Sequence, residues 1–219
     1  MKKNLTLLNA VMILIALIPL IYILITWNQI PQSVPIHFDA DMQPDRMGTK
    51  SDLLLTAGIL AVVSILMLFL FENIHRIDPK RRGVPVSDTF IKLAMGLVVF
   101  LTAMNFIIIF SAIRNTSLIN HLLFPLLGLL FAFLGNYMHN IKPNFFAGFR
   151  LPWTLSDDDN WRKTHQLAGK IWFWGGLTFA IAALFLPSKT AFTIFICLVI
   201  IMSLIPAIYS YNLFRTKTS

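Results

Sequence analysis

The chain has 219 residues, of which 57% are hydrophobic and only 13% are charged. Soluble domains carry about 25% charged residues, so this composition excludes a soluble globular domain. The net charge of +8 is typical of a membrane protein whose cytoplasmic loops are rich in Lys and Arg, and we predict no direct nucleic-acid partner. The single cysteine, Cys197, excludes an internal disulfide.

The apolar residues fall in long blocks, each suited to a helix that crosses a hydrocarbon core about 30 Å thick. We therefore predict an all-α polytopic membrane protein with six transmembrane helices, forming a single membrane domain over residues 1–219. The predicted spans in chain order are Leu5–Thr26, Leu53–Phe71, Phe90–Ile113, Leu122–His139, Ile171–Leu186 and Ala191–Leu213.

Lysine and arginine are distributed unevenly between the two sets of loops. If the N-terminus is inside, four of these residues lie outside: Arg46, Lys50, Arg114 and Lys189. The fourteen on the inside are Lys2, Lys3, Arg76, Lys80, Arg81, Arg82, Lys92, Lys142, Arg150, Arg162, Lys163, Lys170, Arg215 and Lys217. Because cytoplasmic loops carry the excess of Lys and Arg, we predict that the N- and C-termini are both cytoplasmic. The inverted topology is the alternative.

The chain divides into two regions. Residues 1–72 contain the first two spans and the outer loop 28–50, and residues 90–219 contain four spans and the inner segment 140–170. The middles of the predicted spans contain no Asp, Glu, Lys or Arg, which argues against an ion-coupled transporter or a proton relay.

The outer loop contains His37 and three aspartates within nine residues, the last of them Asp45. Imidazole and carboxylate groups can hold a divalent metal, but this spacing matches neither an EF-hand nor a zinc motif, so we predict no metal site. Val34, Ile36 and Phe38 alternate with other residues and predict a short strand-like lip, which could meet an extracellular peptide.

The inner segment gathers aromatic residues around Arg150. Gly148 and Pro152 prevent one regular helix there, and the aromatic side chains suit the headgroup level of a membrane. Ser156 offers an N-cap for the helix that follows.

Residues of the following helix share one face at helical spacing. Trp161, His165, Ala168 and Trp172 are spaced so that they fall on the same side. Elsewhere, Asn105 and Asn136 are the polar groups nearest membrane depth, and we expect them to form interhelical hydrogen bonds. A substrate site is the alternative for these two.

Two sets of motifs resemble a known family. The runs Gly135-Asn136-x-Met138 and Gly148-Phe149-Arg150-x-Pro152-Trp153-Thr154-Leu155-x-Asp157, followed by Trp161 and His165, resemble the SdpI/YfhL family of bacterial immunity proteins. Pro31 and Pro35, His37-Phe38, Pro44-Asp45 and Lys50 resemble the N-terminal domain of unknown function common in that family, although Met42 stands where that pattern usually has Gly.

The resemblance implies a multi-pass protein of the bacterial cytoplasmic (inner) membrane that is not an enzyme and has no cofactor. It implies protection against a secreted antimicrobial peptide toxin that collapses the membrane potential. It also implies sequestration of a cytoplasmic transcriptional repressor at the membrane. The partners implied are membrane lipids, the toxin and the repressor.

Two hypotheses account for the motif residues. Arg150 and Trp153 form a docking site supported by Trp161 and His165, or they form a structural clasp in which Arg150 pairs with one of Asp157–Asp159. The candidate binding residues are Arg150, Pro152, Trp153, Thr154, Asp157, Trp161, His165 and Asn136, with His37 and Asp45 in the outer loop.

Two other function classes remain open at this point. A passive transporter or a lipid- or solute-binding membrane protein needs no charge at membrane depth. A membrane enzyme would use His165, Asp157–Asp159 or His139 as acid–base groups. Neither a nucleophile motif nor a metal signature accompanies those residues.

Overall fold

The computed structural model describes residues 2–39, 41, 43–114 and 118–218, so the position of Met42 lies outside the described residues. Long helices dominate this part of the chain. They are α1 (Lys2–Thr26), α2 (Lys50–Glu72), α4 (Asp88–Arg114), α5 (Leu118–Met138), α7 (Asp158–Ala183) and α8 (Ser188–Thr218). The short elements are η1 (Trp27–Gln29), β1 (Val34–Phe38), β2 (Pro44–Gly48), α3 (Ile74–Ile77) and α6 (Pro152–Ser156).

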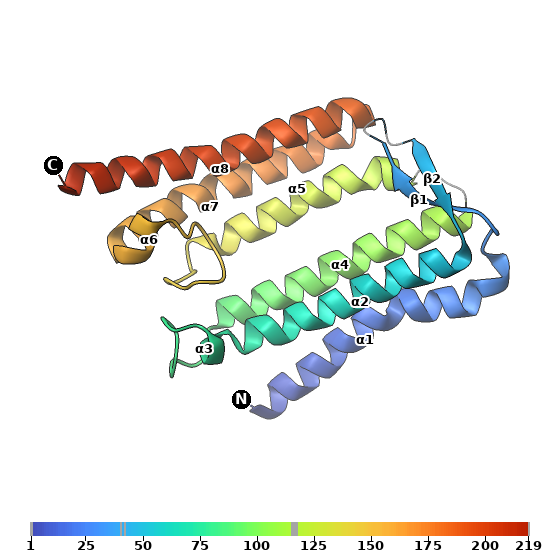
Figure 1. The fold of residues 1–219 in the computed structure, drawn as a ribbon, viewed down its shortest axis with the longest axis horizontal. Helices are drawn as coiled ribbons and strands as arrows, with labels where there is room; N and C mark the ends of the chain where they lie inside the picture. Colours follow the sequence, from blue (N-terminus) through green and yellow to red (C-terminus); the bar gives the residue numbers. More distant parts are fainter. Residues whose placement is uncertain (1, 40, 42, 115–117, 219) are drawn as a thin grey trace.

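The long helices run side by side, and the short elements sit at the two ends of the bundle (Figure 1). The strands β1 and β2 lie at one end, which we call the hairpin end. The first turn of α1, the last turn of α8, α3 and α6 lie at the other, which we call the motif end. Helices α1, α2 and α4 pack together, as do α5, α7 and α8, and α4 contacts α5 between these two groups.

Five of the long helices are long and apolar enough to cross a membrane: α1, α2, α4, α5 and α8. The prediction of six spans is therefore supported for five within the described residues. Helix α7 differs because its first half, from Asp158 to Lys170, carries most of its polar residues. Its apolar half corresponds to the fifth predicted span, Ile171–Leu186.

Large apolar side chains cover the outside of the bundle. Leu14, Leu24 and Ile59 are 62%, 65% and 54% exposed, whereas the small residues Ala57 and Ala61 are almost fully buried. This distribution is expected of helices that face lipid and contact one another through small residues. Asn105 is buried, and its Nδ2 donates to the Ala57 carbonyl oxygen at 3.0 Å, which confirms the interhelical hydrogen bond predicted for it.

The hairpin end corrects the all-α prediction. Strands β1 and β2 pair in antiparallel fashion with irregular register, so the described chain is mostly, rather than entirely, helical. The alternation in β1 was sufficient to predict a strand, and Val34 is buried against α2 and α4. Strand β2 has the sequence Pro-Asp-Arg-Met-Gly and is almost fully exposed. Because it has no buried face, its sequence has no alternation of apolar and polar residues. Across the sheet, the His37 ring nitrogen lies 2.6 Å from the Asp45 carboxylate.

Contacts beyond the strand pairing hold the hairpin in place. Thr49 and Asp52 form a reciprocal capping box at the start of α2, immediately after β2. Lys189 at the start of α8 lies 3.0 Å from the Asp41 carboxylate. The lip is thus joined to both groups of helices.

Candidate functional site

The loop that connects α5 to α6, residues 139–151, contains no helix or strand, and we call it the motif loop. Asn144 organises it from a fully buried position. The Asn144 Oδ1 accepts the N–H groups of Phe146 and Ala147 at 2.8 and 2.7 Å, and its Nδ2 donates to the Lys142 and Ala147 carbonyls. One side chain therefore satisfies four backbone groups that no regular element pairs.

Asp78 ties the motif loop to the link after α3. This carboxylate is fully buried, and its two oxygens accept the N–H groups of Phe145 at 2.9 Å and Lys80 at 2.8 Å. The Lys80 ammonium also donates to the Leu155 carbonyl oxygen. The two groups of helices are thus connected by hydrogen bonds at the motif end as well as by the α4–α5 contact.

His165 holds the second half of the motif loop against α7. Its side chain is 1% exposed. The ring Nδ1 donates to the Trp161 carbonyl at 2.8 Å, and Nε2 accepts the Phe149 N–H at 3.0 Å. Desolvation lowers the pKa of His165 from 6.5 to about 4. The ring is therefore neutral at pH 7, with both nitrogens occupied.

Trp161 lies directly beside this histidine. The two rings stack with centroids 4.0 Å apart, and the indole N–H donates to the Ile141 carbonyl at 2.7 Å. Trp161, His165 and Ala168 are all buried and Trp172 is half-buried, which confirms the shared face predicted from their spacing. Trp161 and His165 hold opposite ends of the same loop.

Thr154 and Pro152 form the start of α6. Pro152 occupies the first helical position, where its missing N–H costs nothing. The Thr154 hydroxyl is fully buried; it accepts the Leu151 N–H at 3.0 Å and lies 2.6 Å from the Phe149 carbonyl oxygen, to which it donates. These two motif residues have structural roles in shaping the turn.

Trp153 attaches α6 to the last turns of α8. Its indole N–H donates to Ser210 Oγ at 2.9 Å, and its ring packs against Tyr211 and Phe214. Asn160 at the start of α7 donates to the Ser210 carbonyl at 2.9 Å, and both Asn160 and Ser210 are buried. Ser210 is therefore the point at which α6, α7 and α8 meet.

Two aspartates at the start of α7, Asp157 and Asp159, pair with basic residues of α7 and α8. Asp157, not Ser156, is the N-cap: its carboxylate accepts the N–H groups of Asp159 and Asn160. The predicted N-cap, Ser156, is instead the last residue of α6, and its hydroxyl donates to the Trp153 carbonyl. The ammonium of Lys217 lies 2.6 Å from the Asp157 carboxylate and lowers the pKa of that group.

Arg150 takes a different partner from the one considered in the clasp hypothesis. Its Nη1 donates to the Phe145 carbonyl at 2.7 Å, and its side chain is exposed. Asp159 pairs instead with Arg162 at 2.7 Å and Lys163 at 2.8 Å, which lowers the pKa of the Asp159 carboxyl. Arg150 thus closes the motif loop while its guanidinium faces the surface.

The other candidate residues lie apart from this cluster. Asn136 is exposed in a groove between α5 and α7, rather than at a buried interhelical contact. His37 and Asp45 are at the hairpin end (Figure 1). No three His, Cys, Asp or Glu side chains gather as a metal site anywhere in the described ranges.

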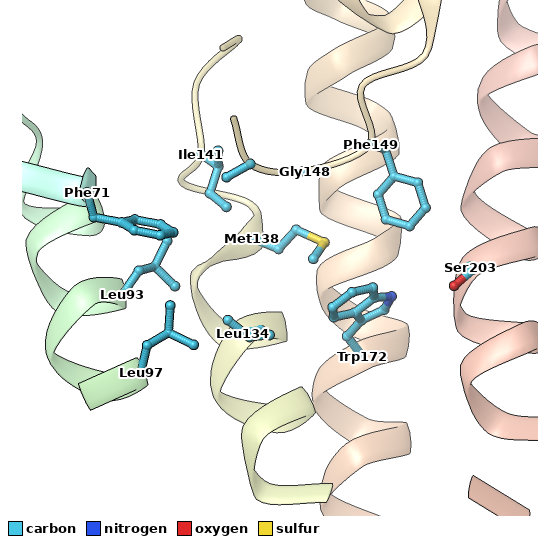
Figure 2. A pocket seen from close by; sticks show the side chains of 11 residues that line it. Phe71, Leu93, Leu97, Leu134, Met138, Ile141, Gly148, Phe149, Trp172 and Ser203 are labelled. Carbon is cyan, nitrogen blue, oxygen red and sulfur yellow. The ribbon is translucent and has the colours of Figure 1, made fainter. Parts of the chain in front are cut away.

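An apolar cavity of about 380 Å³ lies under the motif loop, between the two groups of helices. Figure 2 shows Phe71, Leu93 and Leu97 on one side, with Leu134 and Met138 of α5 in the middle. Gly148 and Phe149 of the motif loop close it at the motif end, and Trp172 and Ser203 line the far side. Its lining suits hydrocarbon and offers few partners to a polar solute.

Helices α5 and α7 approach one another through glycines. A Cβ on Gly176 would lie 2.5 Å from the Ala132 nitrogen and 2.6 Å from the Gly128 carbonyl oxygen. A Cβ on Gly169 would lie 2.9 Å from the Gly135 carbonyl oxygen. These backbone contacts fix how α7 presents His165 to the motif loop.

The comparisons with known proteins match the two regions separately. Residues 140–210, from the motif loop to Ser210, match the SdpI/YfhL protein family, and residues 14–61 match a domain of unknown function, DUF1648. Residues 140–210 are therefore similar to the SdpI/YfhL family. The family match thus contains the motif loop, α6 and nearly all contacts described above.

Two relatives are similar to this chain. The "Immunity protein SdpI" of Bacillus subtilis (strain 168) is 23% identical over 224 residues, which cover 98% of this chain and 97% of that protein. An uncharacterized protein of Archaeoglobus fulgidus is 38% identical over 50 residues, 23% of this chain and 27% of that protein. No solved structure matches.

Sequence reasoning missed several residues of the site. Asn144, Asn160, Ser210 and Lys217 act through partners that their sequence positions do not indicate. The α5–α7 contact had a visible signal, because Gly128 and Gly135, like Gly169 and Gly176, are seven residues apart. Glycines at that spacing fall on one side of a helix.

Proposed function

We propose that this chain is a multi-pass immunity protein of the bacterial cytoplasmic membrane, protecting its host against a secreted antimicrobial peptide toxin. The observation that carries this proposal is the position of the SdpI/YfhL match: it covers the segment in which the motif loop, α6, α7 and α8 interlock. The similarity to an immunity protein over nearly the whole chain supports it.

The proposed topology has six spans, in which the apolar half of α7 is the fifth and α8 is the sixth, and both termini are in the cytoplasm. The first turn of α1 and the last turn of α8 lie at one end of the bundle, as an even number of spans requires (Figure 1). The excess of Lys and Arg on that side supports placing the motif end in the cytoplasm. The hairpin end then faces the incoming toxin.

In this proposal some motif residues hold the motif loop in place as a clasp, and others form a docking surface for a partner. The internal hydrogen bonds of Thr154, Trp161 and His165 support the clasp. The exposed guanidinium of Arg150, beside Phe145 and Phe146, which are 42% and 39% exposed, supports docking. Such a surface would suit a cytoplasmic partner, and a transcriptional repressor is the partner we propose.

Survival of toxin-sensitive bacteria tests the function. Cells that carry the parent, Arg150→Ala or Arg82→Ala are challenged with the secreted toxin peptide, with membrane levels matched by blot. Arg82 is the control, because it is an exposed arginine of the link after α3. We expect the parent and Arg82→Ala to protect and Arg150→Ala to fail.

Each outcome separates the parts of the proposal. A well-expressed parent that gives no protection contradicts immunity against that toxin. Full protection by Arg150→Ala removes Arg150 from the mechanism and leaves it as a structural residue of the loop. Co-purification of a transcriptional repressor with the parent but not with Arg150→Ala would support the docking role.

The apolar cavity supports a second candidate, a passive lipid- or solute-binding protein. Its walls come from both groups of helices, and filling it with Leu97→Trp should displace any lipid that co-purifies with the parent. An enzyme is not supported: His165 is buried with both nitrogens occupied, and the similar protein of Bacillus subtilis is named an immunity protein.

A further inference from the structure

A groove of about 490 Å³, lined by polar side chains and by the aromatic rings of Phe173 and Trp174, lies between α5 and α7. Its floor is backbone, because Gly135 and Gly169 touch there and neither has a side chain to fill the space. Asn136 and His139 line it from α5 and the first residue beyond, and Gln166 and Lys170 line it from α7. The close approach of the two helices thus creates a hollow edged by hydrogen-bonding groups.

The charge in the lining of the groove is positive. The lining contains the ammonium of Lys170, two side-chain amides and an imidazole, and it contains no carboxylate. Asp159 of α7 is engaged elsewhere, since it pairs with Arg162 and Lys163. Within the described part of the chain, no carboxylate lies within ion-pair distance of Lys170. A lysine beside amide donors is a recognition set for a phosphate oxygen.

The groove is at the depth of lipid headgroups. Lys170 is the last charged residue of α7, and everything from Ile171 to Ala183 is uncharged. Asn136 is in the last turn of α5, which ends at Met138. One turn beyond Lys170, Trp174 is 62% exposed and forms the side of the groove that faces the hairpin end. Exposed indoles favour the boundary between headgroups and acyl chains.

We propose that this groove binds the phosphodiester headgroup of an anionic phospholipid. The phosphate lies over the Gly135–Gly169 floor with Lys170 as its charge partner. Asn136 and Gln166 donate to its oxygens, and an acyl chain passes along Trp174. Basic pockets between transmembrane helices on the cytoplasmic side are known to recognise such headgroups. The site shares only His139 with the motif loop, and the proposal does not depend on immunity.

Native mass spectrometry of the full chain in detergent, titrated with phosphatidylglycerol or phosphatidylcholine, tests the proposal. We expect the parent to prefer phosphatidylglycerol. Lys170→Gln should weaken that binding about fivefold or more, the order expected for one lysine facing an anionic lipid. Lys142→Gln is the control, because it removes the same charge from an exposed motif-loop lysine outside the groove.

The remaining outcomes overturn the proposal. Equal affinity for both lipids would show that the groove does not select negative charge. Equal losses in Lys170→Gln and Lys142→Gln would show general attraction to a basic surface. Displacement of the lipid by an equal concentration of inorganic phosphate would identify a site for the free anion instead. Asn136→Leu gives an independent check, since it changes no charge and should also weaken binding.

Discussion

The Nε2 atom of His165 accepts the backbone N–H of Phe149 at 3.0 Å. Through this bond, the protonation state of His165 in α7 affects the conformation of the motif loop. The bond requires a neutral ring, because a proton on Nε2 would face another N–H. It also requires Gly148, whose φ is +104°. A Cβ there would be in direct contact with the same Nε2.

Gly148→Ala should destabilise the protein more than Gly83→Ala. Both glycines have positive φ, but a Cβ on Gly83 would meet nothing within 4 Å. The control therefore measures backbone strain alone, about 1 kcal/mol, and Gly148→Ala adds a clash that raises the loss to about 3 kcal/mol. Thermal unfolding in detergent measures both variants. Equal losses would contradict the contact with His165.

Acid should destabilise the fold through His165. Its folded pKa of about 4 lies below the ordinary 6.5, so the unfolded chain takes up a proton that the folded chain refuses. The contribution of neutral His165 to the free energy of unfolding is complete above pH 6.5. It falls by about 3 kcal/mol as the pH decreases from 6.5 to about 4. His165→Gln does not titrate, so its stability should change less over this window. Parallel pH profiles for parent and variant would refute the prediction.

The sequence located most of the helices because lipid replaces water as their solvent. A block of apolar residues is sufficient evidence for a span, so the ends of α1, α2, α4, α5 and α8 were predicted to within five residues. The full length of helix α7 was harder to predict, because the helix begins at Asp158 and its first half is polar. Strand β2 gave no signal, because it is exposed and its pairing depends on β1.

The candidate site was predictable only where contacts are local. Trp161 and His165 are one helical turn apart, so their shared buried face followed from spacing. The partners of Trp153 and Asp157 could not be derived in this way. Ser210 and Lys217 are 57 and 60 residues away in the chain, and only the packing of α8 brings them close.

Neighbouring glycines of α7 should respond differently to alanine. A Cβ on Gly176 would press on backbone atoms of Ala132 and Gly128, which cannot move without separating the helices. A Cβ on Gly175 would meet the end of the flexible Met202 side chain at 2.5 Å. Gly176→Ala should therefore lower the unfolding temperature, whereas Gly175→Ala should be near neutral, since alanine favours a helix by about 1 kcal/mol. The opposite order would mean that α5 and α7 do not touch through Gly176.

The Trp153–Ser210 hydrogen bond should contribute measurably to docking α6 on α8. Ser210→Ala leaves the indole N–H of Trp153 without its acceptor at 2.9 Å, which should cost about 1–2 kcal/mol for a half-buried donor. Ser203→Ala is the control, because Ser203 is an exposed serine of the same helix that faces the apolar cavity. Unfolding in detergent should show a loss in the first variant alone.

A double-mutant cycle with Trp153→Phe separates this bond from other effects of Ser210. If the indole N–H is the partner, Ser210→Ala should cost less in the Trp153→Phe background than in the parent. The Ser210 carbonyl still accepts from Asn160 in every variant, so that contact cancels. Additive losses would show that the Ser210 hydroxyl acts through its hydrogen bond to the Ala207 carbonyl. Helix α6 would then be held by the packing of the Trp153 ring against Tyr211 and Phe214.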